Sequence, residues 1–119
     1  MIMSENNKWN RRWLELCDSI ASWSKDPSTK VGAFIVDSNN KPVSFGYNGF
    51  AQGVEDTELR LRDRELKYPL TIHAELNAII TAHRHLEGCV LYCTHSPCAA
   101  CMSAIAQAGI KKVVTYVGD

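Results

Sequence analysis

The sequence lacks the features that would place the chain in a membrane, in a secretory pathway or on a nucleic acid. It has no apolar run long enough to span a bilayer. Residues 1–7 contain no apolar segment of the kind that marks a secretory signal. Lys plus Arg and Asp plus Glu number 13 each, so the net charge is zero and gives no long-range attraction to a polynucleotide or to anionic lipid. We therefore expect a soluble, cytoplasmic protein with no membrane partner, and a nucleic-acid partner is disfavoured.

The five cysteines are an odd number, which disulfide pairing alone does not explain. Cys98 and Cys101 form C-x-x-C, which in a reducing compartment indicates a metal site or a redox dithiol before a disulfide. A thioredoxin-like dithiol would leave His73 and Glu75 without a role, so we favour the metal. The remaining cysteines, expected to be small buried apolar residues, are Cys17, Cys89 and Cys93.

The first half of the chain predicts one helix and two strands within a single domain, residues 1–119. Apolar residues at three- and four-residue spacing predict a helix over about 9–23, with its tryptophans packed in the core. Short β-prone runs predict strands at 31–36 and 42–47. The charge-rich stretch 58–67 is expected to be a short, largely exposed helix or an ordered loop.

The second half predicts alternating helices and strands. We expect a helix over 73–85, a strand at 89–94, a helix starting at Pro97 and a strand at 111–117. The last three elements form a strand–helix–strand unit, which predicts parallel strands joined by a right-handed crossover. The side chains expected to face the core are Leu76, Ile79 and Ile80 in the first helix and Met102, Ile105 and Ala106 in the second.

His73-Ala74-Glu75 and Pro97-Cys98-Ala99-Ala100-Cys101 together supply the residues of a catalytic zinc site. One imidazole (His73) and two thiolates (Cys98, Cys101) leave one position of a tetrahedral Zn²⁺ open, which distinguishes catalytic from structural sites. Glu75 is not needed as a ligand and is therefore available for proton transfer. We expect one Zn²⁺ per chain.

A structural zinc site is the main alternative. Cys93 or Cys89 would then act as a fourth ligand and close the tetrahedron, and the chain would be a zinc-stabilised binding module. A closed site does not require Glu75, nor the loop of small and polar residues around Asn48.

The H-x-E and P-C-x-x-C motifs are the pattern of the zinc-dependent nucleobase deaminases. Flanking blocks at 24–33, 46–50, 67–79 and 105–111 resemble the deoxycytidylate (dCMP) deaminase family. The resemblance implies an α/β fold, a three-layer α/β/α sandwich with a mixed sheet, like that of cytidine deaminases. It also implies zinc-dependent hydrolysis of dCMP to dUMP with release of ammonia.

By this resemblance, His73, Cys98 and Cys101 match the zinc ligands and Glu75 matches the proton shuttle. Asn48 matches an asparagine that contacts the sugar and base region of the nucleoside.

The resemblance also suggests contacts at both ends of the substrate. The backbone at Ala74 and Ser96 matches groups that face the amino end of the pyrimidine. Lys25 is a candidate phosphate partner, with a solvated helix-end lysine as an equal alternative. Other phosphate candidates, on a charged face of a kind that usually has no such role, are Arg60, Arg62 and Arg64.

The chain departs from the family in two places. Some members hold a second, structural zinc in an insertion before the catalytic histidine, but that stretch has no Cys or His here, so we expect a single zinc. The sequence stops at Asp119, just after the last expected strand, so the domain is expected either to be a minimal form or to lack the family's C-terminal strand and helix. Family members are commonly hexamers activated by dCTP and inhibited by dTTP, which implies a homo-oligomer with these effectors.

Other substrates remain open at this point. The same zinc chemistry serves 5-modified dCMP, dCTP, free cytidine, and deaminases of tRNA or single-stranded DNA. The zero net charge and the absence of a basic stripe argue against the polynucleotides.

Overall fold

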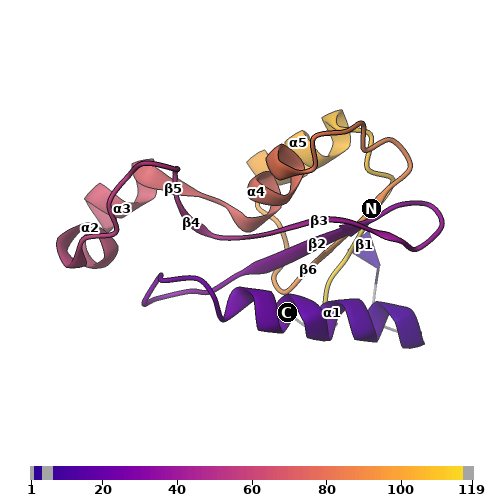
Figure 1. The fold of residues 1–119 in the computed structure, drawn as a ribbon, viewed down its shortest axis with the longest axis horizontal. Coiled ribbons are helices and arrows are strands. Elements are labelled where there is room, and N and C mark those ends of the chain that lie inside the picture. Colours follow the sequence, from indigo (N-terminus) through magenta and orange to yellow (C-terminus); the bar gives the residue numbers. More distant parts are fainter. Residues whose placement is uncertain (1, 4–6, 117–119) are drawn as a thin grey trace.

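The computed structural model describes residues 2–3 and 7–116, which form three layers. A sheet lies in the middle, one helix covers one face, and two helices cover the other (Figure 1). The expected three-layer α/β/α sandwich is thereby confirmed. The elements are β1 (Ile2–Met3), α1 (Lys8–Ala21), β2 (Gly32–Val36), β3 (Pro42–Tyr47), β4 (Gly49–Phe50), α2 (Glu58–Arg62), α3 (Arg64–Leu70), β5 (Thr71–Ile72), α4 (Ala74–Thr81), β6 (Val90–Cys93), α5 (Ala99–Gln107) and β7 (Lys112–Val114).

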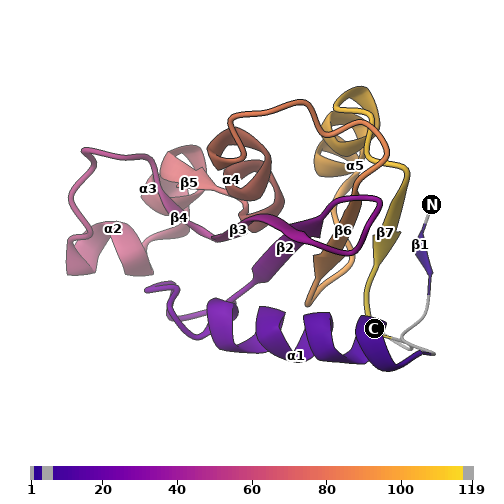
Figure 2. The same ribbon diagram turned by 45° about the vertical axis from the view of Figure 1, so that its right-hand side comes forward.

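The central sheet is mixed, with strand order β1-β7-β6-β2-β3. Strand β2 runs antiparallel to β3 and β6, whereas β6, β7 and β1 are parallel to one another. Helix α5 connects β6 to β7 across one face, as the strand–helix–strand pattern predicted (Figure 2). The edge strand β1 and the two-stranded β4–β5 sheet were not predicted, because two residues are too few to show a periodic pattern.

Strands β2 and β6 are buried on both faces, which explains why their sequences are apolar without alternation. On β2, Phe34 and Val36 pack with α1, and Ala33 and Ile35 pack on the opposite face, toward α4 and α5. On β6, Val90 and Tyr92 pack on the α1 side, and Leu91 and Cys93 pack on the side of α4 and α5. The sheet thus has one apolar core on each side, and the core under α4 and α5 supports the site described below.

Helix α1 begins after Asn7, whose side chain accepts a hydrogen bond from the Asn10 backbone at 2.8 Å. The expectation that all three tryptophans belong to the core was wrong. Trp9 and Trp23 are 43% and 54% exposed, because one lies in the first turn of α1 and the other beyond its last turn. Trp23 instead packs edge-on against the exposed ring of Phe45 on β3, with ring centroids 5.8 Å apart. No helix in the described part of the chain is both long and apolar enough to cross a membrane.

Helices α4 and α5 are placed as expected, but with a narrower buried face. Ala74 and Ala78, one turn apart, lie against the sheet, so Ile80 falls on the opposite side of α4 and is exposed. Ala106 is likewise exposed, since it lies one residue past the buried Ile105. Helix α4 ends at Thr81 and does not continue to 85.

The charge-rich stretch 58–67 forms two short helices, α2 and α3. They break at Asp63, whose side chain accepts a hydrogen bond from the Glu65 backbone and so begins α3. With β4 and β5 they make a small lobe that extends beyond one end of the sandwich (Figure 1).

Candidate metal centre and active site

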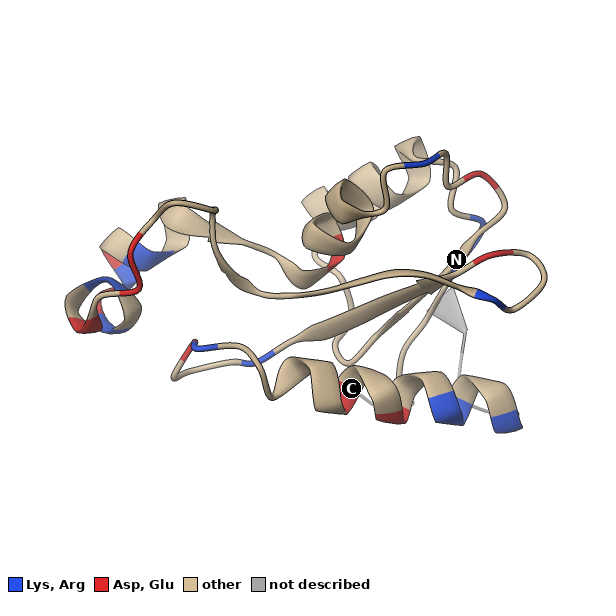
Figure 3. Ribbon diagram, viewed as in Figure 1, with Lys and Arg blue, Asp and Glu red and all other residues tan. Residues whose placement is uncertain are grey.

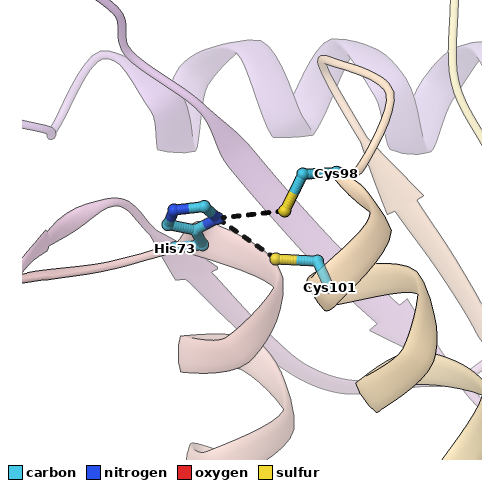
Figure 4. Close-up of side chains that lie close together, drawn as sticks. All are labelled: His73, Cys98 and Cys101. Carbon is cyan, nitrogen blue, oxygen red and sulfur yellow. Dashed lines mark hydrogen bonds between the residues drawn. The ribbon is translucent and has the colours of Figure 1, made fainter. Parts of the chain in front are cut away.

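His73 and Cys98 are the N-cap residues of α4 and α5, and neither side chain caps its own helix. Both residues have extended backbone, which leaves their side chains free to turn toward each other (Figure 4). The His73 Nδ1 atom lies 3.1 Å from Cys101 Sγ and 3.8 Å from Cys98 Sγ. The two helix starts therefore bring three soft donor atoms together, and all three lie within 4.8 Å of one another.

The donor set fits a tetrahedral zinc ion. Zn–S bonds of about 2.3 Å and Zn–N bonds of about 2.0 Å at tetrahedral angles place neighbouring donors about 3.5–3.8 Å apart. The observed His73 Nδ1 distances, 3.1 and 3.8 Å, bracket this range closely. Within the described residues the cluster contains three donors and includes neither Cys89 nor Cys93. The geometry therefore favours an open, catalytic type of site over a closed structural one.

Three of the five cysteines lie outside the donor cluster. Cys17, Cys89 and Cys93 are fully buried among apolar side chains, as the sequence predicted. Cys101 is also buried, and burial, with a smaller effect of the Glu75 carboxylate, raises its pKa to about 12. A bound cation is what would stabilise this sulfur as a thiolate.

Glu75 lies in the first turn of α4, two residues after the candidate ligand His73, and is buried. It lines the same pocket as His73 and Cys98. Burial raises the pKa of this carboxyl above its ordinary value, although a backbone hydrogen bond and the nearby His73 and His95 act in the opposite direction. A carboxyl whose pKa moves toward neutrality can both accept and donate a proton, which is what a proton shuttle requires.

The pocket in front of these residues has a volume of about 540 Å³, a size typical of small-molecule sites. His73, Glu75 and Cys98 are among the residues that line it. Ala74 and Ser96, both expected near the amino end of a pyrimidine, line it as well. His95, which the sequence analysis did not single out, also lines it.

Asn48 lies in the wall of the pocket and is held there by its own hydrogen bonds. Its side-chain Oδ1 accepts from the Val31 backbone N–H at 2.9 Å, and its Nδ2 donates to the Thr29 carbonyl at 2.9 Å. Its backbone carbonyl accepts from the Ser24 hydroxyl at 2.8 Å. Because one partner is a donor and the other an acceptor, the carboxamide has one orientation. Asn48 is thus in position to face a ligand and also ties the loop before β2 to the end of β3.

Lys25 does not line the pocket, unlike Asn48, Ala74 and Ser96, the other expected substrate contacts. Its side chain is 71% exposed, and its Nζ pairs with Asp56 Oδ2 at 3.0 Å. The lysine in the pocket wall is Lys67, which is 3% exposed and pairs with Asp26 Oδ1 at 3.1 Å. Lys67 belongs to the charge-rich stretch 58–67, which the sequence predicts to be largely exposed. The signal available for it was its place in the Lys67-Tyr68-Pro69 block just before His73.

Comparisons with known proteins agree with this site. A family model described as the cytidine and deoxycytidylate deaminase zinc-binding region matches residues 7–117. The chain is 48% identical over 107 residues to the uncharacterized deaminase in the luxG 3′ region of Aliivibrio fischeri, covering 90% of this chain and 71% of that protein. It is 42% identical over 113 residues to the deoxycytidylate deaminase of Homo sapiens, covering 90% of this chain. The chain spans 64% of the length of that human relative.

Among solved structures, the chain is similar to the dCMP deaminase of cyanophage S-TIM5 in complex with dCMP and dUMP. The TM-score is 0.73 at 31% identity, and the match covers 89% of this chain and 81% of that one. The apo form of the same protein gives a TM-score of 0.75 at 29% identity, covering 92% of this chain and 84% of that chain. With the sequence match spanning nearly the whole chain and the donor cluster in place, the chain belongs to the cytidine and deoxycytidylate deaminase family.

Proposed function

We propose that the chain hydrolyses dCMP to dUMP and ammonia as a zinc-dependent deaminase. The observation that carries the proposal is that Glu75 lines the same pocket as His73 and Cys98, two members of the three-donor cluster. The substrate class is supported by relatives named deoxycytidylate deaminases and by a similar structure that holds dCMP and dUMP. Here dCMP is the small-molecule partner, and residues 1–119 act as one deaminase domain.

His73, Cys98 and Cys101 would hold the zinc ion. When bound, zinc supplies a Lewis acid and lowers the pKa of a water molecule toward neutrality. Glu75 accepts a proton from the attacking water and donates a proton to ring nitrogen N3 of the cytosine. It then takes the second proton of the water, from the hydroxyl now bonded to C4, and delivers it to the amino group. The C4–N bond breaks as the C4 carbonyl forms, so that one water is consumed and one ammonia is released. Buried in the pocket wall, Glu75 is shielded from bulk water while it carries these protons.

The remaining groups of the pocket orient the nucleotide. Asn48 presents a carboxamide already fixed by the backbone of Val31 and Thr29, so binding a sugar would need little reorganisation. The backbone at Ala74, the first residue of α4, and at Ser96, two residues before the N-cap of α5, faces the amino end of the ring.

The Glu75→Gln variant tests the proposal. It keeps the size of the side chain but cannot shuttle protons, so zinc per chain should remain at one while ammonia release from dCMP falls by about 10²–10⁴-fold. The matched control is Glu15→Gln, which removes an exposed carboxylate on α1 and should behave as wild type. Full activity in Glu75→Gln would disprove the assignment, and absence of ammonia release by wild type from dCMP would disprove the function.

The family resemblance adds three finer proposals. The protein acts in the cytoplasm, assembles as a homo-oligomer (a hexamer by resemblance), and responds to dCTP as activator and dTTP as inhibitor. In the part of the chain that the structure describes, β3 is an edge strand of the sheet. This edge, with the exposed rings of Phe45 and Tyr47 beside Trp23, is compatible with subunit contact. Light scattering gives the mass, and dCMP assays with and without each effector test the regulation.

A further inference from the structure

On the function proposed above, the substrate carries a phosphate dianion, and the pocket needs a cation that is free to bind it. The sequence offers several candidates near the pocket, and the structure separates them by what each one already binds. Figure 3 shows that basic and acidic residues gather together on the α2–α3 lobe.

Four of the candidate cations already bind protein atoms. Lys25 pairs with Asp56, and Arg62 pairs with Glu58 one helical turn away. Arg60 donates to the Glu55 carbonyl at 3.0 Å. None of these three lines the pocket. Lys67 does line it, but its ammonium is bound to Asp26 Oδ1 at 3.1 Å and to the Ser28 hydroxyl at 3.3 Å.

Arg64 is the remaining cation, and it lines the pocket. Within the described residues it forms no ion pair, and its guanidinium lies over the ring of Tyr68, 5.9 Å from the centroid. Tyr68 lines the pocket too, so the ring holds the guanidinium at the pocket wall. A guanidinium offers a planar set of donors that matches phosphate oxygens in pairs.

The position of Arg64 in the fold matches the 5′ end of a nucleotide whose base lies at the metal donors. Arg64 begins α3, and the seven residues of that helix span ~10 Å before β5 leads to His73. The metal donors lie at the other end of this path, at the start of α4. A base placed at the metal end would therefore direct its 5′ substituent toward α3.

We propose that Arg64 binds the 5′-phosphate of the substrate and makes the pocket selective for a nucleoside monophosphate over the free nucleoside. Lys67 has a different role: paired with Asp26, it holds α3 against the loop at 26–29. The permanent charge of Arg64, and not that of the expected Lys25, then selects the phosphate.

The test compares dCMP with deoxycytidine, which differs by the phosphate alone. In Arg64→Gln the KM for dCMP should rise roughly tenfold to a hundredfold, as expected when a charged hydrogen-bonding group is lost, with kcat little changed. kcat/KM for deoxycytidine should not change. Arg64→Lys, which keeps the charge but not the paired donors, should lie between wild type and Arg64→Gln. Added salt should raise the dCMP KM of wild type more than that of Arg64→Gln.

Arg62→Gln is the matched control, since Arg62 lies on the same lobe but outside the pocket, and its dCMP KM should equal that of wild type. Calorimetry with dUMP and deoxyuridine separates this proposal from the proposed function, because it needs no turnover. Arg64→Gln should weaken dUMP binding and leave deoxyuridine binding unchanged. An unchanged dCMP KM and dUMP affinity, or an equal loss for nucleotide and nucleoside, would overturn the role of Arg64. A wild type that binds dUMP more tightly than deoxyuridine but releases no ammonia from dCMP would overturn the function alone.

Discussion

Gly46 of β3 lies directly against Ala74 in the first turn of α4. A Cβ placed on Gly46 would come within 2.5 Å of the Ala74 carbonyl oxygen and within 2.6 Å of the Ala78 backbone nitrogen. Both atoms belong to the backbone of the helix that carries His73 at its N-cap and Glu75 in its first turn. The missing side chain at position 46 therefore lets α4 approach the sheet closely, and with it the proposed proton shuttle.

Gly46→Ala should move α4 away from β3, because the contact is with backbone atoms that have no rotamer to adopt. We expect a loss of about 1–3 kcal/mol in the free energy of unfolding, the usual cost of an overpacked core. Ammonia release from dCMP should fall by about a hundredfold, since a shift of about 1 Å in a reacting group has that scale of effect. Denaturant unfolding and steady-state assays measure the two effects.

The stability control is Gly49→Ala on β4, the strand that follows β3 in the sequence. A Cβ at Gly49 would meet no atom within 4 Å, and Gly49 is not among the glycines with positive φ. Its unfolding midpoint should remain near that of wild type. Equal unfolding midpoints for Gly46→Ala and Gly49→Ala would show that the close approach of β3 and α4 does not restrict position 46 to glycine.

The zinc content of cysteine variants distinguishes an open from a closed metal site. Cys101→Ser removes one of the three clustered donors, and bound zinc should fall from one per chain toward none. Cys93→Ala should retain one zinc per chain, because Cys93 lies outside the cluster and is buried among apolar side chains. Its cost should appear only as a loss of about 1 kcal/mol in stability, typical of a core truncation. Elemental analysis of the purified variants measures the zinc, and loss of zinc from Cys93→Ala would favour the structural site.

The sequence predicted best where one physical signal acts alone. Continuous apolar runs placed β2 and β6, because strands buried on both faces need no alternation. Residue chemistry at fixed spacing predicted the His73, Cys98 and Cys101 cluster, because both motifs stand at helix starts that the fold brings together.

The side-chain surroundings that the sequence did not predict depend on partners far apart in the sequence. Lys25 and Lys67 have the same chemistry, and only the tertiary structure shows that Asp56 binds the first at the surface while Asp26 draws the second into the pocket wall. Ile80 was expected to be buried by its hydrophobicity, but the helix face is decided by which side the sheet occupies.

The Asp26–Lys67 ion pair is shielded from solvent, with side chains 12% and 4% exposed. Burial by itself would raise the pKa of Asp26, but the backbone N–H groups of Ser28 and Thr29 and the Lys67 ammonium outweigh it, so the pKa lies below its ordinary value. A carboxyl whose pKa is lower in the folded chain than in the unfolded chain contributes stability while it is ionised. That contribution is full above about pH 4, the unfolded value, and is lost as the pH falls through the folded value.

Asp26→Asn should therefore destabilise the protein in a pH-dependent way. At pH 7 it leaves the buried Lys67 ammonium without its counter-charge, and we expect a loss of about 3 kcal/mol in the free energy of unfolding. Below about pH 4 the difference from wild type should shrink, because Asp26 of the wild type becomes protonated and neutral as well. Urea unfolding of both proteins between pH 7 and pH 3 measures this. The exposed Glu58–Arg62 pair provides the control, since Glu58→Gln should follow wild type across the whole range. A difference between Asp26→Asn and wild type that stays constant down to pH 3 would mean that packing, and not the charge of Asp26, accounts for the loss.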